Sequence, residues 1–161
     1  MSFLHVTTNY YKKFKISKDC SIFSAEAIAI LRALAYIDSL DQSKNFLIVS
    51  DSQSVLKSIQ NFYKTKSENY LIYKICDIMC KINKIVELLW CPSHVGIQPN
   101  EFVDSLAKQA ITDGVALNMG LTYVDAINSL KKNLLNCGKH FGTPLQNRGV
   151  LFALCHAQNW M

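Results

Sequence analysis

The chain has 161 residues, a length typical of one domain with room for a short extension. Half of its residues are hydrophobic and it holds only 6 Gly and 3 Pro, which favours a packed core and excludes a disordered or collagen-like protein. Its 17 basic and 12 acidic residues give a formal charge of +5, which suits an anionic partner but is also common in soluble domains. We expect an intracellular protein that is not secreted and does not bind membranes, because no apolar run reaches the roughly 18 residues of a spanning helix and no signal peptide is visible.

The first part of the chain predicts two strands followed by a long helix. Residues 3–8 and 11–17 have the pattern of short strands joined by a turn. Ser21 then opens an apolar segment over residues 22–37, with the length and period of a buried helix.

Strands and helices alternate in the rest of the chain. The pattern predicts strands at 46–50 and 85–90, and helices at 52–63, 70–82, 100–112 and 121–135. This order indicates an α/β fold with a mixed sheet flanked by helices. We expect one domain over residues 1–113 and a helical C-terminal extension over residues 114–161, to which no role is assigned.

Glu26 lies on an apolar stripe of the first predicted helix. Its neighbours three and four positions away are all apolar: Ile22, Phe23, Ala29 and Ile30. A carboxylate on such a stripe must be neutralised, paired or bound to metal, because burying it charged and alone is very costly. The alternative is a surface glutamate on a mildly polar outer face.

Asp51 directly follows the apolar strand 46–50. The carboxyl ends of strands in open α/β sheets are where ligands bind. The alternative is that Asp51 caps the helix that follows it.

Asp104 and His94 lie near the last predicted helix of the domain. Asp104 is four residues from Lys108, so an ion pair on a solvated helix face is the alternative to a functional role. His94 lies in a loop, where it could donate a structural hydrogen bond, be exposed, or shuttle protons.

Three acids from two helices and a strand end would make sense together as ligands of divalent metal. Mg²⁺ prefers oxygen ligands and is usually held by a few carboxylates and substrate phosphates. Two such ions about 4 Å apart can activate water and stabilise the leaving oxygen in phosphodiester cleavage.

Three segments carry a resemblance to a known family. Residues 21–30, 50–56 and 90–108 closely resemble type-1 ribonuclease H domains, most of all those of non-LTR retrotransposon polyproteins. The resemblance covers about residues 3–113. Its most specific motif carries, in the family's order and spacing, His94, Gly96, Asn100, Glu101, Asp104, Ala107 and Lys108.

The resemblance implies a ribonuclease H-like fold that cleaves the RNA strand of RNA–DNA hybrids with Mg²⁺ or Mn²⁺, two ions in the complete site. It makes Glu26, Asp51 and Asp104 the metal ligands and catalytic residues, and gives His94 a part in proton transfer and product release. It also implies that residues from the first and last helices bind or support the substrate: Ser21, Ser24, Ala25, Asn100 and Glu101.

The chain departs from the family at its start. Residues 3–8 and 11–17 match the family's second and third strands, so the central first strand and its metal-binding aspartate are absent from this sequence. We expect a gap or a rearranged contact where that strand belongs, and weakened hydrolysis by this chain alone.

Two rival functions follow from these observations. One is a non-catalytic retroelement remnant that binds nucleic acid. The other is a different member of the same wide fold group, such as an integrase or an exonuclease, and the motif over residues 90–108 argues against it.

Cations and aromatic residues mix around the break between the two middle helices. They are Lys57, Tyr63, Lys64, Lys66 and Tyr70. They could contact a DNA backbone, or they could form an ordinary solvated run.

Overall fold

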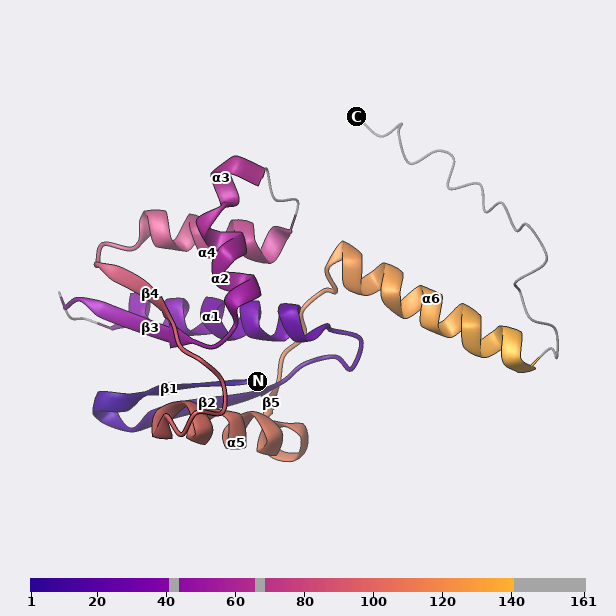
Figure 1. Cartoon of the computed structure of the whole chain (residues 1–161), viewed down its shortest axis with the longest axis horizontal. Coiled ribbons are helices and arrows are strands. Elements are labelled where there is room, and N and C mark those ends of the chain that lie inside the picture. Colours follow the sequence, from indigo (N-terminus) through magenta and orange to yellow (C-terminus); the bar gives the residue numbers. More distant parts are fainter. Residues whose placement is uncertain (41–43, 66–68, 141–161) are drawn as a thin grey trace. The chain divides into compact units, whose positions relative to one another are not determined.

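The computed structural model of the chain describes residues 1–40, 44–65 and 69–140. Figure 1 shows the elements, which in chain order are β1 (Ser2–His5), η1 (Val6–Thr8), β2 (Tyr10–Lys15), α1 (Ile22–Ser39), β3 (Phe46–Ser50), α2 (Gln53–Gln60), α3 (Phe62–Thr65), α4 (Tyr70–Lys81), β4 (Val86–Trp90), α5 (Gln98–Asp113), β5 (Val115–Ala116) and α6 (Tyr123–His140). Strands and helices alternate along the chain, so the predicted α/β fold is confirmed.

The strands form two sheets. In the first, β1 pairs antiparallel with β2, from Ser2 opposite Lys13 to His5 opposite Tyr10, and β2 pairs parallel with β5. In the second, β3 and β4 run parallel and in register. Parallel and antiparallel pairs therefore occur together, as predicted for a mixed sheet.

No hydrogen-bonded ladder joins the two sheets among the described residues. The sequence predicts a separation at this place, because the family's central strand would lie between the strands that correspond to β1 and β3. The edges of β1 and β3 that would flank such a strand belong to different sheets.

Helix α1 packs between layers of the fold. Figure 1 shows α1 with β1 and β2 on one side and α4 on the other, while α5 covers the opposite side of β1 and β2. The core cluster joins α1, α2 and α4 through Leu34, Val55, Leu71, Ile72 and Ile75, which are all fully buried. Burial of each such side chain contributes about 1.5–3 kcal/mol, so this cluster fixes α1 on its neighbours.

Several elements differ from the sequence prediction. The strand predicted over 3–8 ends at His5 and continues as the 3-10 helix η1, and the helix predicted over 121–135 spans Tyr123–His140. The predicted helix over 52–63 is broken at Asn61, whose backbone N–H bonds back to Lys57 and Ile59. Helix α5 begins at Gln98, two residues early, because proline is tolerated in the first turn of a helix. The short strand β5 was not predicted, since two residues are too few to show a period.

The chain divides into two compact units, Met1–Ala126 and Ile127–Met161. The first unit continues past residue 113, where the sequence prediction set the end of the domain. Its later residues pair with β2, because Val115 lies opposite Phe14 in the ladder between β2 and β5.

Two further observations concern the described residues. Within the described part of the chain, no helix combines the length and apolarity needed to cross a bilayer. The cysteines at positions 20, 76, 80 and 91 are free thiols.

Candidate active site

Asp51 lies just past the carboxyl end of β3. Its side-chain Oδ2 accepts a hydrogen bond from Asn100 Nδ2 at 3.4 Å, and its backbone oxygen accepts from Trp90 Nε1 at 3.2 Å. The N-cap residue of α2 is Ser52, so capping does not explain Asp51. The Asp51 carboxylate instead faces α5.

Glu26 lies in the second turn of α1 and is half-buried. Its Oε2 accepts a hydrogen bond from Ser52 Oγ, and Ser52 is buried. Because Ser52 directly follows Asp51, this bond brings the Glu26 carboxylate to the same end of β3. The alternative of a free surface glutamate does not describe this residue.

Helix α5 brings a third acidic group to the site. His94 Nδ1 lies 3.8 Å from Asp104 Oδ2 and 3.9 Å from Glu101 Oε2. These three side chains offer ligand atoms within 4.8 Å of one another, a spacing that could hold a metal ion. The helix is tied to the first sheet, because Ser2 Oγ donates to the backbone oxygen of Val103 at 2.8 Å.

The loop before α5 places His94 in an uncommon backbone conformation. Its φ is 55°, in the left-handed region that few residues other than glycine adopt, and Gly96 two residues later has a φ of 79°. The loop therefore turns sharply and presents His94 to the side chains of α5.

The charges of the site act on one another. Burial raises the pKa of Asp104 above its ordinary value, the negative charge of Asp51 raises it further, and His94 acts in the opposite direction. Burial also raises the pKa of the Cys91 thiol, with smaller contributions from Asp51 and Asp104. Asp51 and Asp104 are therefore close enough to repel each other, and a bound cation would relieve this repulsion.

The structure thus brings Glu26, Asp51, Asp104 and His94 to one region, from four separate segments of the chain. Among the described residues, no lysine or arginine lies within ion-pair distance of the three acids, and Asp104 approaches His94 rather than Lys108. Oxygen ligands without a basic partner are the kind of set that Mg²⁺ or Mn²⁺ binds. Among the described residues, the set whose ligand atoms lie close enough for one ion is His94, Glu101 and Asp104, and Glu26 and Asp51 are not part of that set.

Some predicted substrate residues have partners within the protein. Asn100 donates to Asp51, and Glu101 belongs to the cluster around His94. Ser24 is only 2% exposed and its hydroxyl donates to Asp125. A contact between Ser24 and RNA stays a prediction, and it would require the hydroxyl to leave Asp125.

Sequence reasoning missed two residues of this region, Ser52 and Asp125. Ser52 carries no signal in the sequence beyond its place after Asp51. Asp125 does carry one, because a threonine at 122 followed by an acid three positions later is a pattern typical of a helix start.

Only part of the predicted surface of lysines and tyrosines is free to contact nucleic acid in this structure. Tyr63 is exposed, but the Tyr70 hydroxyl donates to the backbone oxygen of Gly120 at 3.0 Å. Lys66 falls outside the described residues. A role for this surface in binding nucleic acid stays a prediction.

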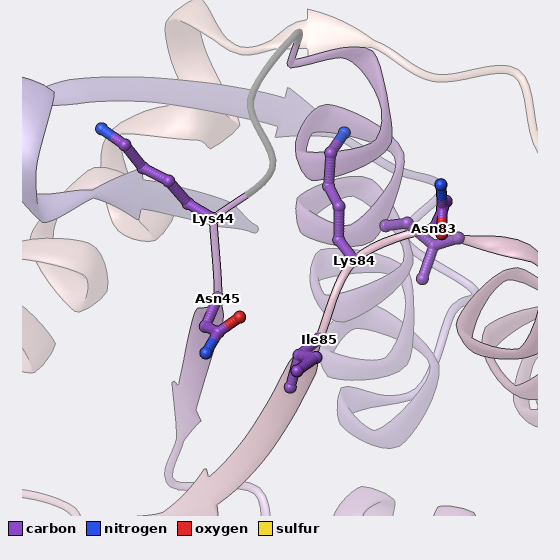
Figure 2. A pocket seen from close by; sticks show the side chains of 6 residues that line it. Lys44, Asn45, Asn83, Lys84 and Ile85 are labelled. Carbon is purple, nitrogen blue, oxygen red and sulfur yellow. The ribbon is translucent and has the colours of Figure 1, made fainter.

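A hollow lies at the amino ends of β3 and β4, away from the acids. Figure 2 shows its lining, which includes Lys44, Asn45, Asn83, Lys84 and Ile85. Lys84 Nζ donates hydrogen bonds to three backbone oxygens at the end of α1. Its charge is therefore already used within the protein.

A comparison with families of known proteins matches most of the domain to one of them. The family model for RNase H matches residues 5–112, more than half of the chain. The matched region contains all of Glu26, Asp51, His94 and Asp104, and it ends before Asp125.

Proposed function

Because the chain belongs to the RNase H family, we propose that its acidic site cleaves the RNA strand of RNA–DNA hybrids by metal-dependent hydrolysis. The family as a whole acts on nucleic acid as a hydrolase and uses divalent metal ions. The choice of Mg²⁺ or Mn²⁺, the number of ions and the hybrid substrate are our proposal for this chain. The resemblance of residues 90–108 to non-LTR retrotransposon domains supports a retroelement origin.

One observation carries this proposal. Ser52, the residue after Asp51, bonds Glu26 of α1, Asn100 of α5 bonds Asp51, and His94 lies beside Asp104 of α5, while no lysine or arginine lies within ion-pair distance of the three acids in the described part of the chain. Burial, and after it the charge of Asp51, raises the pKa of Asp104, so keeping this carboxylate ionised costs free energy. A divalent cation would offset that cost.

We assign Glu26, Asp51 and Asp104 as the residues that would hold the ion or ions. A bound divalent ion supplies an activated water and stabilises the negative charge that develops on the phosphate oxygens.

The remaining side chains have supporting roles in this proposal. Ser52 orients Glu26 and Asn100 orients Asp51 through their hydrogen bonds. His94 is 74% exposed and lies beside Asp104, so its Nδ1 can accept or release a proton at the edge of the site.

Three carboxylates are one fewer than the family resemblance implies, because the sequence holds no strand with the bridging aspartate. We therefore expect this chain to bind Mn²⁺ and hybrid, and to hydrolyse the hybrid slowly on its own.

The test separates binding from cleavage. Mn²⁺ binding, hybrid binding and hybrid cleavage are measured on the chain, on Asp51→Asn, and on Asp77→Asn as a matched control. Asp77 is suitable because it is a partly exposed acid of α4 that pairs with Lys81 at 2.8 Å, away from the site. We expect Asp51→Asn to lose Mn²⁺ binding and any cleavage, while Asp77→Asn keeps both.

Two outcomes would contradict the proposal. If Asp51→Asn cleaves hybrid as the unmodified chain does, Asp51 is not part of the site. If the chain binds hybrid equally with and without Asp51 and never requires metal, the rival reading of a non-catalytic nucleic-acid-binding protein replaces ours.

A further inference from the structure

The first turn of α1 is held by Asp125, a residue beyond the region that matches the family. Its Oδ1 accepts a hydrogen bond from the backbone N–H of Ser21 at 3.0 Å, and its Oδ2 accepts from Ser24 Oγ at 2.6 Å. Asp125 is 1% exposed. Hydrogen bonds to an ionised carboxylate are roughly twice as strong as neutral ones, so this contact is strong for its size.

The segment that carries Asp125 is itself fixed to the rest of the first compact unit. Thr122 Oγ1 accepts from the N–H of Asp125 at 3.1 Å, and the Thr122 backbone oxygen accepts from Ala126 at 2.9 Å. Just before it, the Tyr70 hydroxyl bonds to the backbone oxygen of Gly120. Asp125 is therefore presented to α1 from an ordered turn.

The contact reaches the residues that begin α1. Ser21 is the N-cap, and its Oγ accepts from the N–H of Ser24 at 3.2 Å. Asp125 thus binds both the capping residue and the residue that is capped. A helix leaves its first N–H groups without internal partners, so its first turn frays unless such contacts hold it.

Glu26 lies just after this turn, on another face of α1. It follows Ser24 by two residues, which at about 3.6 residues per turn places it roughly 200° around the helix. There it accepts the hydrogen bond from Ser52. The start of α1 is consequently held on one face by Asp125 and on the other by Ser52.

We propose that Asp125 is a positioning residue for the active site: by holding the first turn of α1, it keeps the Glu26 carboxylate beside Asp51. The role of Glu26 as a metal ligand rests on the proposed function. The functional unit then extends from the family match, which ends at residue 112, through Asp125.

Removal of the carboxylate has a defined physical result. The Ser21 N–H and the Ser24 hydroxyl lose their acceptor, and Ser24 is too buried for water to replace it freely. The first turn of α1 would open more often, and Glu26 would spend less time in the geometry that binds metal. Losing a partner bonded directly to a metal ligand costs about 10–100-fold in metal affinity, and Asp125, which acts through the first turn of α1, should lie at the lower end of that range.

The experiment compares three variants of the full chain, Asp125→Ala, Asp125→Asn and Asp77→Ala, at a temperature where all are folded. The measured quantity is the Kd for Mn²⁺. We expect Asp125→Ala to weaken binding about tenfold and Asp77→Ala to leave it unchanged. Asp125→Asn should restore most of the affinity, because its amide oxygen can accept from Ser21 and its NH₂ can donate to Ser24.

A role in stability alone gives a different result. Asp125→Ala would then lower Tm while the folded chain kept its Kd for Mn²⁺, and that outcome would overturn the proposal. If Asp125→Ala does not fold, Ser24→Ala replaces it, since this variant removes one of the two bonds; an unchanged Kd in Ser24→Ala likewise overturns the proposal.

Hydrogen exchange separates this inference from the proposed function. The backbone amides of residues 24–27 should exchange faster in Asp125→Ala than in Asp77→Ala. If the unmodified chain binds no Mn²⁺, the proposed function fails, and exchange then decides whether Asp125 holds the helix. Equal exchange in both variants would show that it does not.

Discussion

The two ends of α1 are held by side chains of opposite charge. At the N-terminus, the Asp125 carboxylate accepts from Ser21 and Ser24. At the C-terminus, Lys84 Nζ donates to the backbone oxygens of Ile37 at 2.7 Å and Leu40 at 2.6 Å. Both choices suit the helix dipole, which is positive at its N-terminus and negative at its C-terminus.

The two ends of α1 differ in the residues that surround them. Asp125 binds Ser24, which lies two residues before Glu26, and Glu26 bonds Ser52 at the carboxyl end of β3. Lys84 acts beside the open hollow at the amino ends of β3 and β4, where no predicted site residue lies (Figure 2). The same physical device therefore serves the site at one end and stability alone at the other.

The largest effect is expected from Glu26→Gln, which changes the N-terminal end at the site itself. Loss of a ligand carboxylate should weaken Mn²⁺ binding by more than about 100-fold, beyond the 10–100-fold typical of residues that only orient a ligand. Calorimetric titration measures the affinity, and Glu87→Gln on an exposed part of β4 is the matched control. An affinity equal to that of Glu87→Gln would remove Glu26 from the site.

Asp125→Ala should have the next largest effect, on stability as well as on metal binding. The two groups that lose their acceptor are buried or partly buried, so we expect the free energy of unfolding to fall by about 2 kcal/mol. Urea denaturation at pH 7 measures it. A change no greater than that of the partly exposed Asp77→Ala would mean that water replaces the carboxylate.

Lys84→Met tests the opposite end of α1. Methionine keeps the apolar stem but cannot donate to the helix oxygens, so the free energy of unfolding should fall by about 1 kcal/mol. The Kd for Mn²⁺ should stay unchanged, because no site residue depends on this end. A weakened Kd would break the comparison by showing that both ends of α1 serve the site.

The smallest effect concerns pH. Burial alone would raise the pKa of Asp125, but hydrogen bonds from Ser24, Ser21 and Thr122 outweigh it and hold the pKa below its usual value. A group whose pKa is lowered on folding contributes stability above its unfolded pKa of about 3.9, and this contribution is lost as pH falls through the folded value.

The measurement for this last prediction is the difference in unfolding free energy between the unmodified chain and Asp125→Asn. We expect this difference, of less than about 1 kcal/mol, to shrink as the pH falls from 6 to 3. A constant difference over that range would mean that the charge of Asp125 does not contribute.

Much of the fold could be predicted because its signals are local. The apolar period over 22–37 and the strand at 46–50 follow from residues close together in the chain, and the structure places elements there. The break at Asn61 and the two-residue strand β5 could not be predicted, since neither changes the period of the sequence.

The candidate site was predictable only in part. The sequence predicts Glu26 as a site residue because it is an acid on an apolar stripe, and Asp51 because it is an acid at a strand end. Asn100, the partner of Asp51, was predicted only through the motif over residues 90–108, and Ser52, the partner of Glu26, gave no signal, because a serine is ordinary at a helix start.

By itself the sequence determined the α/β order of elements, the family and the acids that could bind metal, because periodicity and motif spacing are properties of neighbouring residues. Only the tertiary structure decided that β5 joins the sheet beside β2, and that Asp125 meets Ser21 and Ser24 across roughly a hundred residues. Such contacts depend on how the layers pack around α1, and packing joins residues whose separation along the chain carries no pattern.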